Sequence, residues 1–146
     1  MLRSLVVQDL ALLERAELEL GAGLTLLTGE TGSGKSLLVD ALGLALGGRA
    51  QSGLVRAGAE RAQVQASFES NGRPLEVQRT VGPRGSASRD GEPIAIADLA
   101  ALGRSLVAVH GQHDQQALVE PGAQAALLDA LAGAGAERAR VAALHE

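Results

Sequence analysis

The chain has 146 residues, enough for one domain with a hydrophobic core, and 46% of them are hydrophobic. It has no cysteine and one aromatic residue, Phe68, which excludes disulfides, thiolate metal sites and an aromatic platform for single-stranded nucleic acid. The net charge is −4, and only residues 49–104 are basic on balance, with eight basic and six acidic groups. This excess is too small to predict DNA binding from charge alone. No apolar run is long enough to span a membrane, so we expect a cytoplasmic protein without a membrane partner.

Three segments near the start of the chain have the patterns of strands. Residues 2–7 are mostly apolar, and residues 16–20 alternate between apolar and acidic side chains. Residues 24–28 are short, apolar and preceded by glycines, which predicts a buried strand. Two strands ahead of this third one are unusual for a simple nucleotide kinase.

Residues 29–36 read Gly-Glu-Thr-Gly-Ser-Gly-Lys-Ser, a complete Gly-x-x-x-x-Gly-Lys-Ser phosphate-binding loop. Its glycines allow successive amides to face phosphate oxygens, and the N-terminus of the following helix adds partial positive charge. Lys35 is expected on the β- and γ-phosphates, and the Ser36 hydroxyl on Mg²⁺. The helix is predicted over residues 36–46, ended by Gly47-Gly48. Its expected apolar face consists of Leu38, Ala41, Leu42 and Ala45.

Residues 62–96 carry the signals of an antiparallel meander. Asn71-Gly72 is a strong hairpin signal, and Asp90-Gly91 predicts a second tight turn between residues 86–89 and a short strand near 93–96. The apolar side chains that alternate along the first two strands are Val64, Ala66, Phe68, Leu75, Val77 and Val81. Four arginines are expected on the solvated face: Arg73, Arg79, Arg84 and Arg89.

The last third of the chain is predicted to be mostly helical. A short helix is expected over residues 97–104, and the apolar residues 106–109 suit a buried parallel strand. Pro121 at a first helical position opens a helix through residue 131. Residues 136–146 begin another helix that stops with the chain, which we interpret as a truncation.

A polar cluster follows the expected strand at 106–109, where open α/β sheets place ligands. It contains His110, Gln112, His113 and Asp114. A zinc site would need further ligands, and a His/Asp hydrolase would need a nucleophile that is not visible. A third interpretation is a sensor of the γ-phosphate, in which the Gln112 amide oxygen ligates Mg²⁺ and orients water. A capped polar turn without a chemical role remains the simplest alternative.

Three segments carry a family resemblance. Residues 5–13 (Leu-Val-Val-Gln-Asp-Leu-Ala-Leu-Leu), the loop at 29–36 and, above all, residues 109–116 (Val-His-Gly-Gln-His-Asp-Gln-Gln) resemble the N-terminal part of the RecN family of bacterial DNA repair proteins. That family is similar to the structural-maintenance-of-chromosomes (SMC) proteins, and its ABC-type ATPase head is split in sequence by a coiled coil. The resemblance implies an α/β P-loop NTPase of the ABC type: an N-terminal lobe with an antiparallel β-subdomain and part of a parallel core sheet.

The resemblance also implies domains and site residues. Residues 1–136 would form the N-terminal lobe, and residues 137–146 would begin the coiled-coil arm. Gln112 would match the Q-loop glutamine, act with Lys35 in catalysis and ligate Mg²⁺ with Ser36. Arg56 is similar in placement to an arginine-loop residue, although a plain surface arginine fits equally well. The residues expected to hold ATP are Gly29, Glu30, Thr31, Gly32, Ser33, Gly34, Lys35, Ser36, Leu37 and Arg56.

The chain lacks the Walker B acid and the Ser-Gly-Gly signature that the family carries in its C-terminal half. We therefore expect ATP hydrolysis only with the C-terminal lobe of the same head and a second head in an ATP-sandwiched homodimer. DNA would be engaged through the complete protein, in the cytoplasm at the nucleoid. Two alternatives stay open: a small P-loop kinase, and a nucleotide-gated interaction module without hydrolysis.

Overall fold

The computed structural model describes residues 1–146 except 31, 33, 52, 71, 110–122, 145 and 146. The chain divides into two compact units, Met1–Ala108 and Val109–Glu146, and each is described by itself. None of the described helices has the length and apolarity that crossing a bilayer requires.

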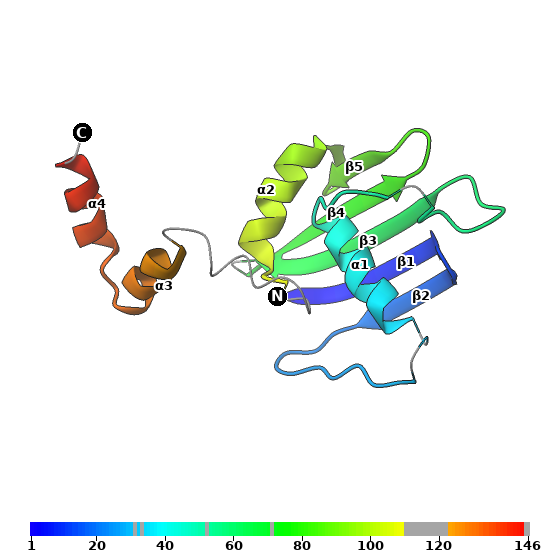
Figure 1. Cartoon of the computed structure of the whole chain (residues 1–146), viewed down its shortest axis with the longest axis horizontal. Helices are drawn as coiled ribbons and strands as arrows, with labels where there is room; N and C mark the ends of the chain where they lie inside the picture. Colours follow the sequence, from blue (N-terminus) through cyan, green and yellow to red (C-terminus); the bar gives the residue numbers. More distant parts are fainter. Residues whose placement is uncertain (31, 33, 52, 71, 110–122, 145–146) are drawn as a thin grey trace. The chain divides into compact units, whose positions relative to one another are not determined.

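The first unit is built on a six-stranded sheet in the order β2-β1-β3-β4-β5-β6, in which every described neighbour is antiparallel (Figure 1). The strands are β1 (Leu2–Leu10), β2 (Leu13–Glu19), β3 (Ala62–Ser70), β4 (Arg73–Val81), β5 (Ser86–Arg89) and β6 (Glu92–Pro93). The predicted meander is confirmed. Its second turn has Asp90 at φ 50° and Gly91 at φ 84°, the left-handed pair that a two-residue hairpin requires. The short strand expected near 93–96 begins one residue earlier, at Glu92, and already ends at Pro93, because Ile96 begins a helix.

One face of the sheet is apolar and the other is polar, because successive side chains of a strand point to opposite faces. On β3 and β4 the predicted core positions are all buried, including Val64, Phe68 and Val77 at 2% exposure or less. The opposite face carries partly exposed polar side chains such as Gln65, which pairs across the strands with Gln78. The sheet therefore has one face that packs on helices and one that faces solvent.

Arg79 corrects the sequence prediction, because it lies on the buried face and not on the solvated one. Its register partners are Val64 on β3 and Ala87 on β5, and only 5% of it is exposed. The sequence does contain this information, since Arg79 lies two residues from both Val77 and Val81 and therefore on the same face of the strand. Burial lowers the pKa of the guanidinium by desolvation. Arg73, Arg84 and Arg89 are exposed, as predicted.

Two helices cover the apolar face (Figure 1). Helix α1 (Lys35–Ala45) packs on β1, β3 and β4, and α2 (Ile96–Leu106) packs on β5. The predicted stop of α1 is confirmed as a Schellman-type end: the Gly48 amide donates to the Gly43 carbonyl at 2.8 Å and the Gly47 amide to the Leu44 carbonyl at 3.0 Å. The buried residues of α1 are Ala41, Leu44 and Ala45.

Two predicted strands are absent from the first unit, and both corrections concern the expected parallel sheet. Residues 24–28 have no regular secondary structure, and Leu24 and Leu26 are 96% and 78% exposed. A strand requires a hydrogen-bonded neighbour, and no described strand pairs with this segment. At 106–109, Leu106 is the last residue of α2 and the Val107 amide still donates to the Gly103 carbonyl. The antiparallel subdomain is thus confirmed, whereas parallel pairing is not found among the described strands.

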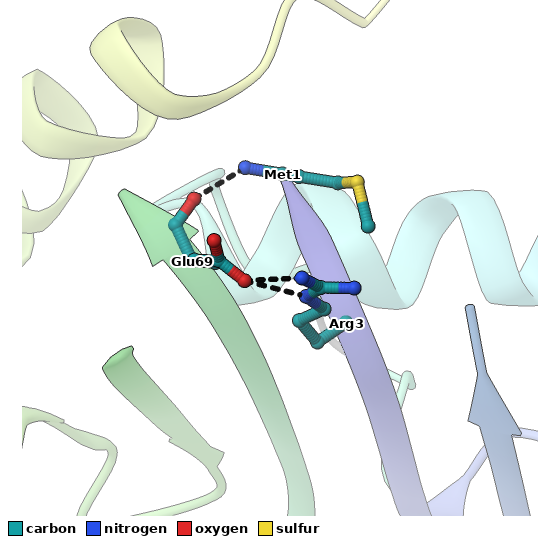
Figure 2. Close-up of polar contacts among 3 residues, drawn as sticks. All are labelled: Met1, Arg3 and Glu69. Atoms are coloured by element: carbon teal, nitrogen blue, oxygen red, sulfur yellow. Dashed lines mark hydrogen bonds and ion pairs between the residues drawn. The ribbon is translucent and has the colours of Figure 1, made fainter. Parts of the chain in front are cut away.

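The start of β1 is tied to the end of β3 (Figure 2). The Met1 amine donates to the Glu69 carbonyl at 2.5 Å. The Arg3 guanidinium donates to the Glu69 carboxylate through Nε at 3.0 Å and also through Nη2. Hydrogen bonding and the charge of Arg3 hold the pKa of Glu69 below its usual value.

The second unit contains two short helices. Helix α3 (Ala123–Leu131) ends at the predicted residue, and α4 (Gly135–Ala143) follows a break in which Gly133 has φ 68°. The predicted opening at Pro121 lies outside the described residues. The domain boundary between 136 and 137 stays a prediction.

Candidate nucleotide-binding site

The phosphate-binding loop has the backbone conformation that its glycines predict. Gly29, Gly32 and Gly34 have φ values of 159°, 86° and 90°. Gly34 is the N-cap of α1 and contributes no side-chain cap, so the first amides of the helix are not covered by a side chain. Thr31 and Ser33 lie outside the described residues. The described glycines therefore have backbone conformations that suit a loop which presents amides to an anion at the N-terminus of α1.

Lys35 brings its ammonium group back over the loop. Its Nζ donates to the carbonyl oxygens of Gly29 and Glu30, both at 2.6 Å. These bonds draw the two ends of the loop together and keep the positive charge at its mouth. Because carbonyl oxygens are weaker partners than phosphate oxygens for an ammonium group, an anionic ligand can replace them.

A hollow of about 560 Å³ lies directly over this loop. Its lining includes Gly32, Lys35, Ser36 and Leu37 from the predicted site. The other predicted residues on the lining are Gly29 and Gly34. No cluster of three or more His, Cys, Asp or Glu side chains suited to a metal is found in the described parts of the chain. A metal at this hollow would thus depend on Ser36 and on oxygens of the ligand itself.

Two residues of the lining were missed by sequence reasoning. Ala11 and Leu12 form the turn between β1 and β2, and both line the hollow opposite the loop. Ala11 has a left-handed φ of 50°, and Leu12 is 83% exposed. Nothing in the local sequence marks a nucleotide contact here, because the turn meets the loop only through tertiary folding. It supplies the apolar wall that a ligand with an organic part requires.

Arg56 lies beside this turn. Its Nη1 donates to the Leu12 carbonyl at 3.4 Å, and its Nη2 lies 3.4 Å from the Glu14 carboxylate. The Arg56 amide donates to the Asp9 carbonyl at 2.9 Å, so backbone and side chain both hold the turn. Arg56 is not on the lining of the hollow, and its predicted contact with nucleotide stays a prediction.

The polar cluster at 110–114 lies outside the described residues. The predicted roles of Gln112, as well as the zinc and polar-turn alternatives for His110 and His113, stay predictions.

Comparison with known families assigns the chain. The family described as "AAA domain" matches residues 4–103, which include all of the sheet except the first two residues of β1, the phosphate-binding loop and most of α2. The chain belongs to the AAA domain family. A domain of this family that holds a complete phosphate-binding loop is a nucleotide-binding domain.

Curated relatives of this AAA domain confirm the resemblance to RecN. The chain is 39% identical over 151 residues to "DNA repair protein RecN" of Vibrio cholerae, an alignment that covers 91% of this chain and 27% of the relative. It is 37% identical over 158 residues to the protein of the same name from Bacillus subtilis, with 95% and 27% covered. The chain thus spans about a quarter of the length of these relatives. They give no support to the kinase alternative.

A solved structure supports the fold. The chain matches a structure described by the words "ATP-driven dimerization and DNA stimulated activation of SMC ATPases" with a TM-score of 0.65 and 21% identity. The match covers 87% of this chain and 90% of that one. The likeness to this structure supports the α/β fold with an antiparallel subdomain.

Proposed function

We propose that this chain is the ATP-binding lobe of an SMC-like ATPase head in a protein of DNA double-strand break repair and recombination. The observation that carries the proposal is the curled loop at 29–36, with Lys35 over its mouth and a hollow of about 560 Å³ above it. The names of the relatives, which describe DNA repair proteins, support DNA repair as the general process.

Different residues of the site would bind different parts of Mg-ATP. Lys35 would exchange its bonds to Gly29 and Glu30 for oxygens of the β- and γ-phosphates. Ser36, on the first turn of α1, would hold Mg²⁺ through its hydroxyl. When bound, Mg²⁺ would neutralise part of the negative charge of the phosphates. The apolar turn at Ala11 and Leu12 would face the base or ribose.

Hydrolysis would require groups beyond this lobe. A basic or water-orienting residue typically contributes orders of magnitude to such a reaction. No described acidic residue lines the hollow above Lys35. We propose that the acid and the signature come from the C-terminal lobe and from a second head, closed by ATP in a homodimer. Gln112 would respond to the γ-phosphate, and DNA would be engaged by the complete cytoplasmic, nucleoid-associated protein.

The test measures binding and hydrolysis separately. Calorimetry with Mg-ATP should detect binding by the 146-residue chain, and Lys35→Ala should weaken it about 10- to 100-fold, since bonds to charged groups contribute about 1.5–3 kcal/mol. ATP turnover by the chain alone should be negligible, and adding the C-terminal lobe should restore it. In the restored head, Gln112→Ala should lower turnover while Mg-ATP still binds.

Arg73→Ala provides the control, because this exposed arginine on β4 has no ion pair in the described part of the chain and does not line the hollow. Equal Mg-ATP affinity in the folded Lys35→Ala and Arg73→Ala variants would defeat the assignment of the loop. Turnover of about one per second by the monomeric 146-residue chain, the low end for kinases, would favour the kinase alternative.

A further inference from the structure

A second hollow, distinct from the nucleotide site, lies at one end of the sheet. It has a volume of about 660 Å³ and is lined by residues 59–61, Thr80 and residues 82–84. The first of these segments leads into β3 and the second follows β4, so that both leave the same end of an antiparallel pair (Figure 1). We refer to this surface, with Arg61 and Arg84 in its lining, as the basic hollow.

The two arginines of the basic hollow have no ion-pair partner among the described residues. Arg56 and Arg89, in contrast, have carboxylate partners. One carboxylate, Glu60, is present in the lining. The hollow therefore has a net positive charge in a chain whose overall net charge is −4.

The walls of the hollow are held together by close backbone contact. A Cβ atom added to Gly82, which has φ 155°, would lie 3.0 Å from the Glu60 carbonyl oxygen and 3.2 Å from the Arg61 Cβ. Glycine thus lets the turn after β4 approach the segment that carries Arg61. The two arginines are brought to one surface by this approach, although they are 23 positions apart in sequence.

The buried Arg79 forms hydrogen bonds to both ends of the turn between β4 and β5. Its Nη1 donates to the carbonyl oxygens of Thr80 and Ser86, the residues that flank the turn, at 3.2 and 3.0 Å. Its Nε has no hydrogen-bond partner, and no described carboxylate pairs with it. Arg79 thereby holds the two ends of the turn in place.

We propose that the basic hollow binds phosphate groups of the DNA backbone, through Arg61 and Arg84 and the hydroxyl of Thr80. Guanidinium groups bind phosphate oxygens in a bidentate manner, and a hydroxyl donates to the same oxygens. Such contacts fix the position of a duplex without reading its sequence. The choice of DNA as the source of phosphate rests on the proposed function in DNA repair; the phosphate chemistry rests on the hollow alone.

The test is fluorescence anisotropy of a labelled DNA duplex with the 146-residue chain, without nucleotide, over a series of salt concentrations. Loss of two phosphate contacts in the double variant Arg61→Gln/Arg84→Gln should reduce the slope of log K against log salt by about 1.8. The matched control is Arg73→Gln/Arg104→Gln, which removes the same charge from exposed arginines outside the hollow and should keep the slope. Arg61→Lys/Arg84→Lys should also keep most of it, because the charge remains.

Three results would overturn the proposal. The first is an equal change of slope in the test and control variants, and the second is no change in a double variant whose circular dichroism is native. The third is that binding of inorganic pyrophosphate depends on Arg61 and Arg84, whereas binding of DNA does not. This result would assign the hollow to a free phosphate compound. Lys35→Ala should leave DNA binding intact, so failure of the nucleotide assignment is distinguishable from failure of this one.

Discussion

The close contact of α2 with Leu46 and Gly47, which follow the end of α1, predicts a sharp difference among four glycines. Gly47 has φ 84°, and a Cβ atom added there would lie 2.4 Å from the backbone nitrogen of Ala100 in α2. Gly58 has nearly the same φ, 88°, with nothing within 4 Å of its added Cβ. Gly103 lies inside α2, and its added Cβ would be 2.5 Å from the Leu46 carbonyl oxygen. Gly43, inside α1, has open space.

Replacing each glycine with alanine therefore separates backbone strain from steric conflict. Gly58→Ala should lower the free energy of unfolding by about 1–2 kcal/mol, the cost of a left-handed residue with a Cβ. Gly47→Ala carries this cost and also overpacks the helix contact, which adds about 1–3 kcal/mol. Gly103→Ala produces the same kind of steric conflict, but the higher helix propensity of alanine offsets it by about 1 kcal/mol. Gly43→Ala has no such conflict and should raise the free energy of unfolding by up to about 1 kcal/mol.

The measurement is urea denaturation followed by circular dichroism, with stability compared at constant m value. A loss of about 3 kcal/mol would lower the midpoint by roughly 1.5 M if m is about 2 kcal/mol/M. Gly47→Ala should have the lowest midpoint of the four and Gly43→Ala the highest. Equal midpoints for Gly47→Ala and Gly58→Ala would show that α2 does not contact the end of α1, and would refute the described packing.

Two further predictions concern the nucleotide site and the sheet. Leu12→Ser should weaken ATP binding about tenfold by calorimetry, since burying a leucine contributes about 1.5 kcal/mol or more. The same variant should bind tripolyphosphate as well as the native chain does, because this ligand has no base or ribose. Equal losses of affinity for both ligands would show that Leu12 does not contact the base or ribose. Arg3 lowers the pKa of Glu69 in the folded state. Their interaction therefore stabilises the fold at pH values above the unfolded-state pKa of Glu69, and this stabilisation is lost as the pH falls through the folded-state pKa. The difference in Tm between the native chain and Glu69→Gln should therefore shrink as pH falls below about 4, near the ordinary glutamate pKa, and a constant difference would contradict this reasoning.

Features that depend on near neighbours in sequence were determined by the sequence itself. The end of α1 at Gly47-Gly48 and the turn at Asp90-Gly91 follow from the left-handed φ values that glycine and aspartate tolerate. The buried face of β3 follows from its alternating apolar residues. The loop at 29–36 was also predictable, because its glycines and Lys35 act within one short stretch of backbone.

Tertiary structure decided the features that depend on distant partners. Residues 24–28 have the composition of a strand but no described neighbour to bond with, and a strand is stable only when paired. The turn at Ala11 and Leu12 lines the hollow above the phosphate-binding loop only because the sheet and α1 bring it there. Arg61 and Arg84 likewise share a hollow only because β3 and β4 pair in antiparallel register. Local sequence encodes backbone conformation, whereas the placement of side chains around a site requires the long-range pairing of strands.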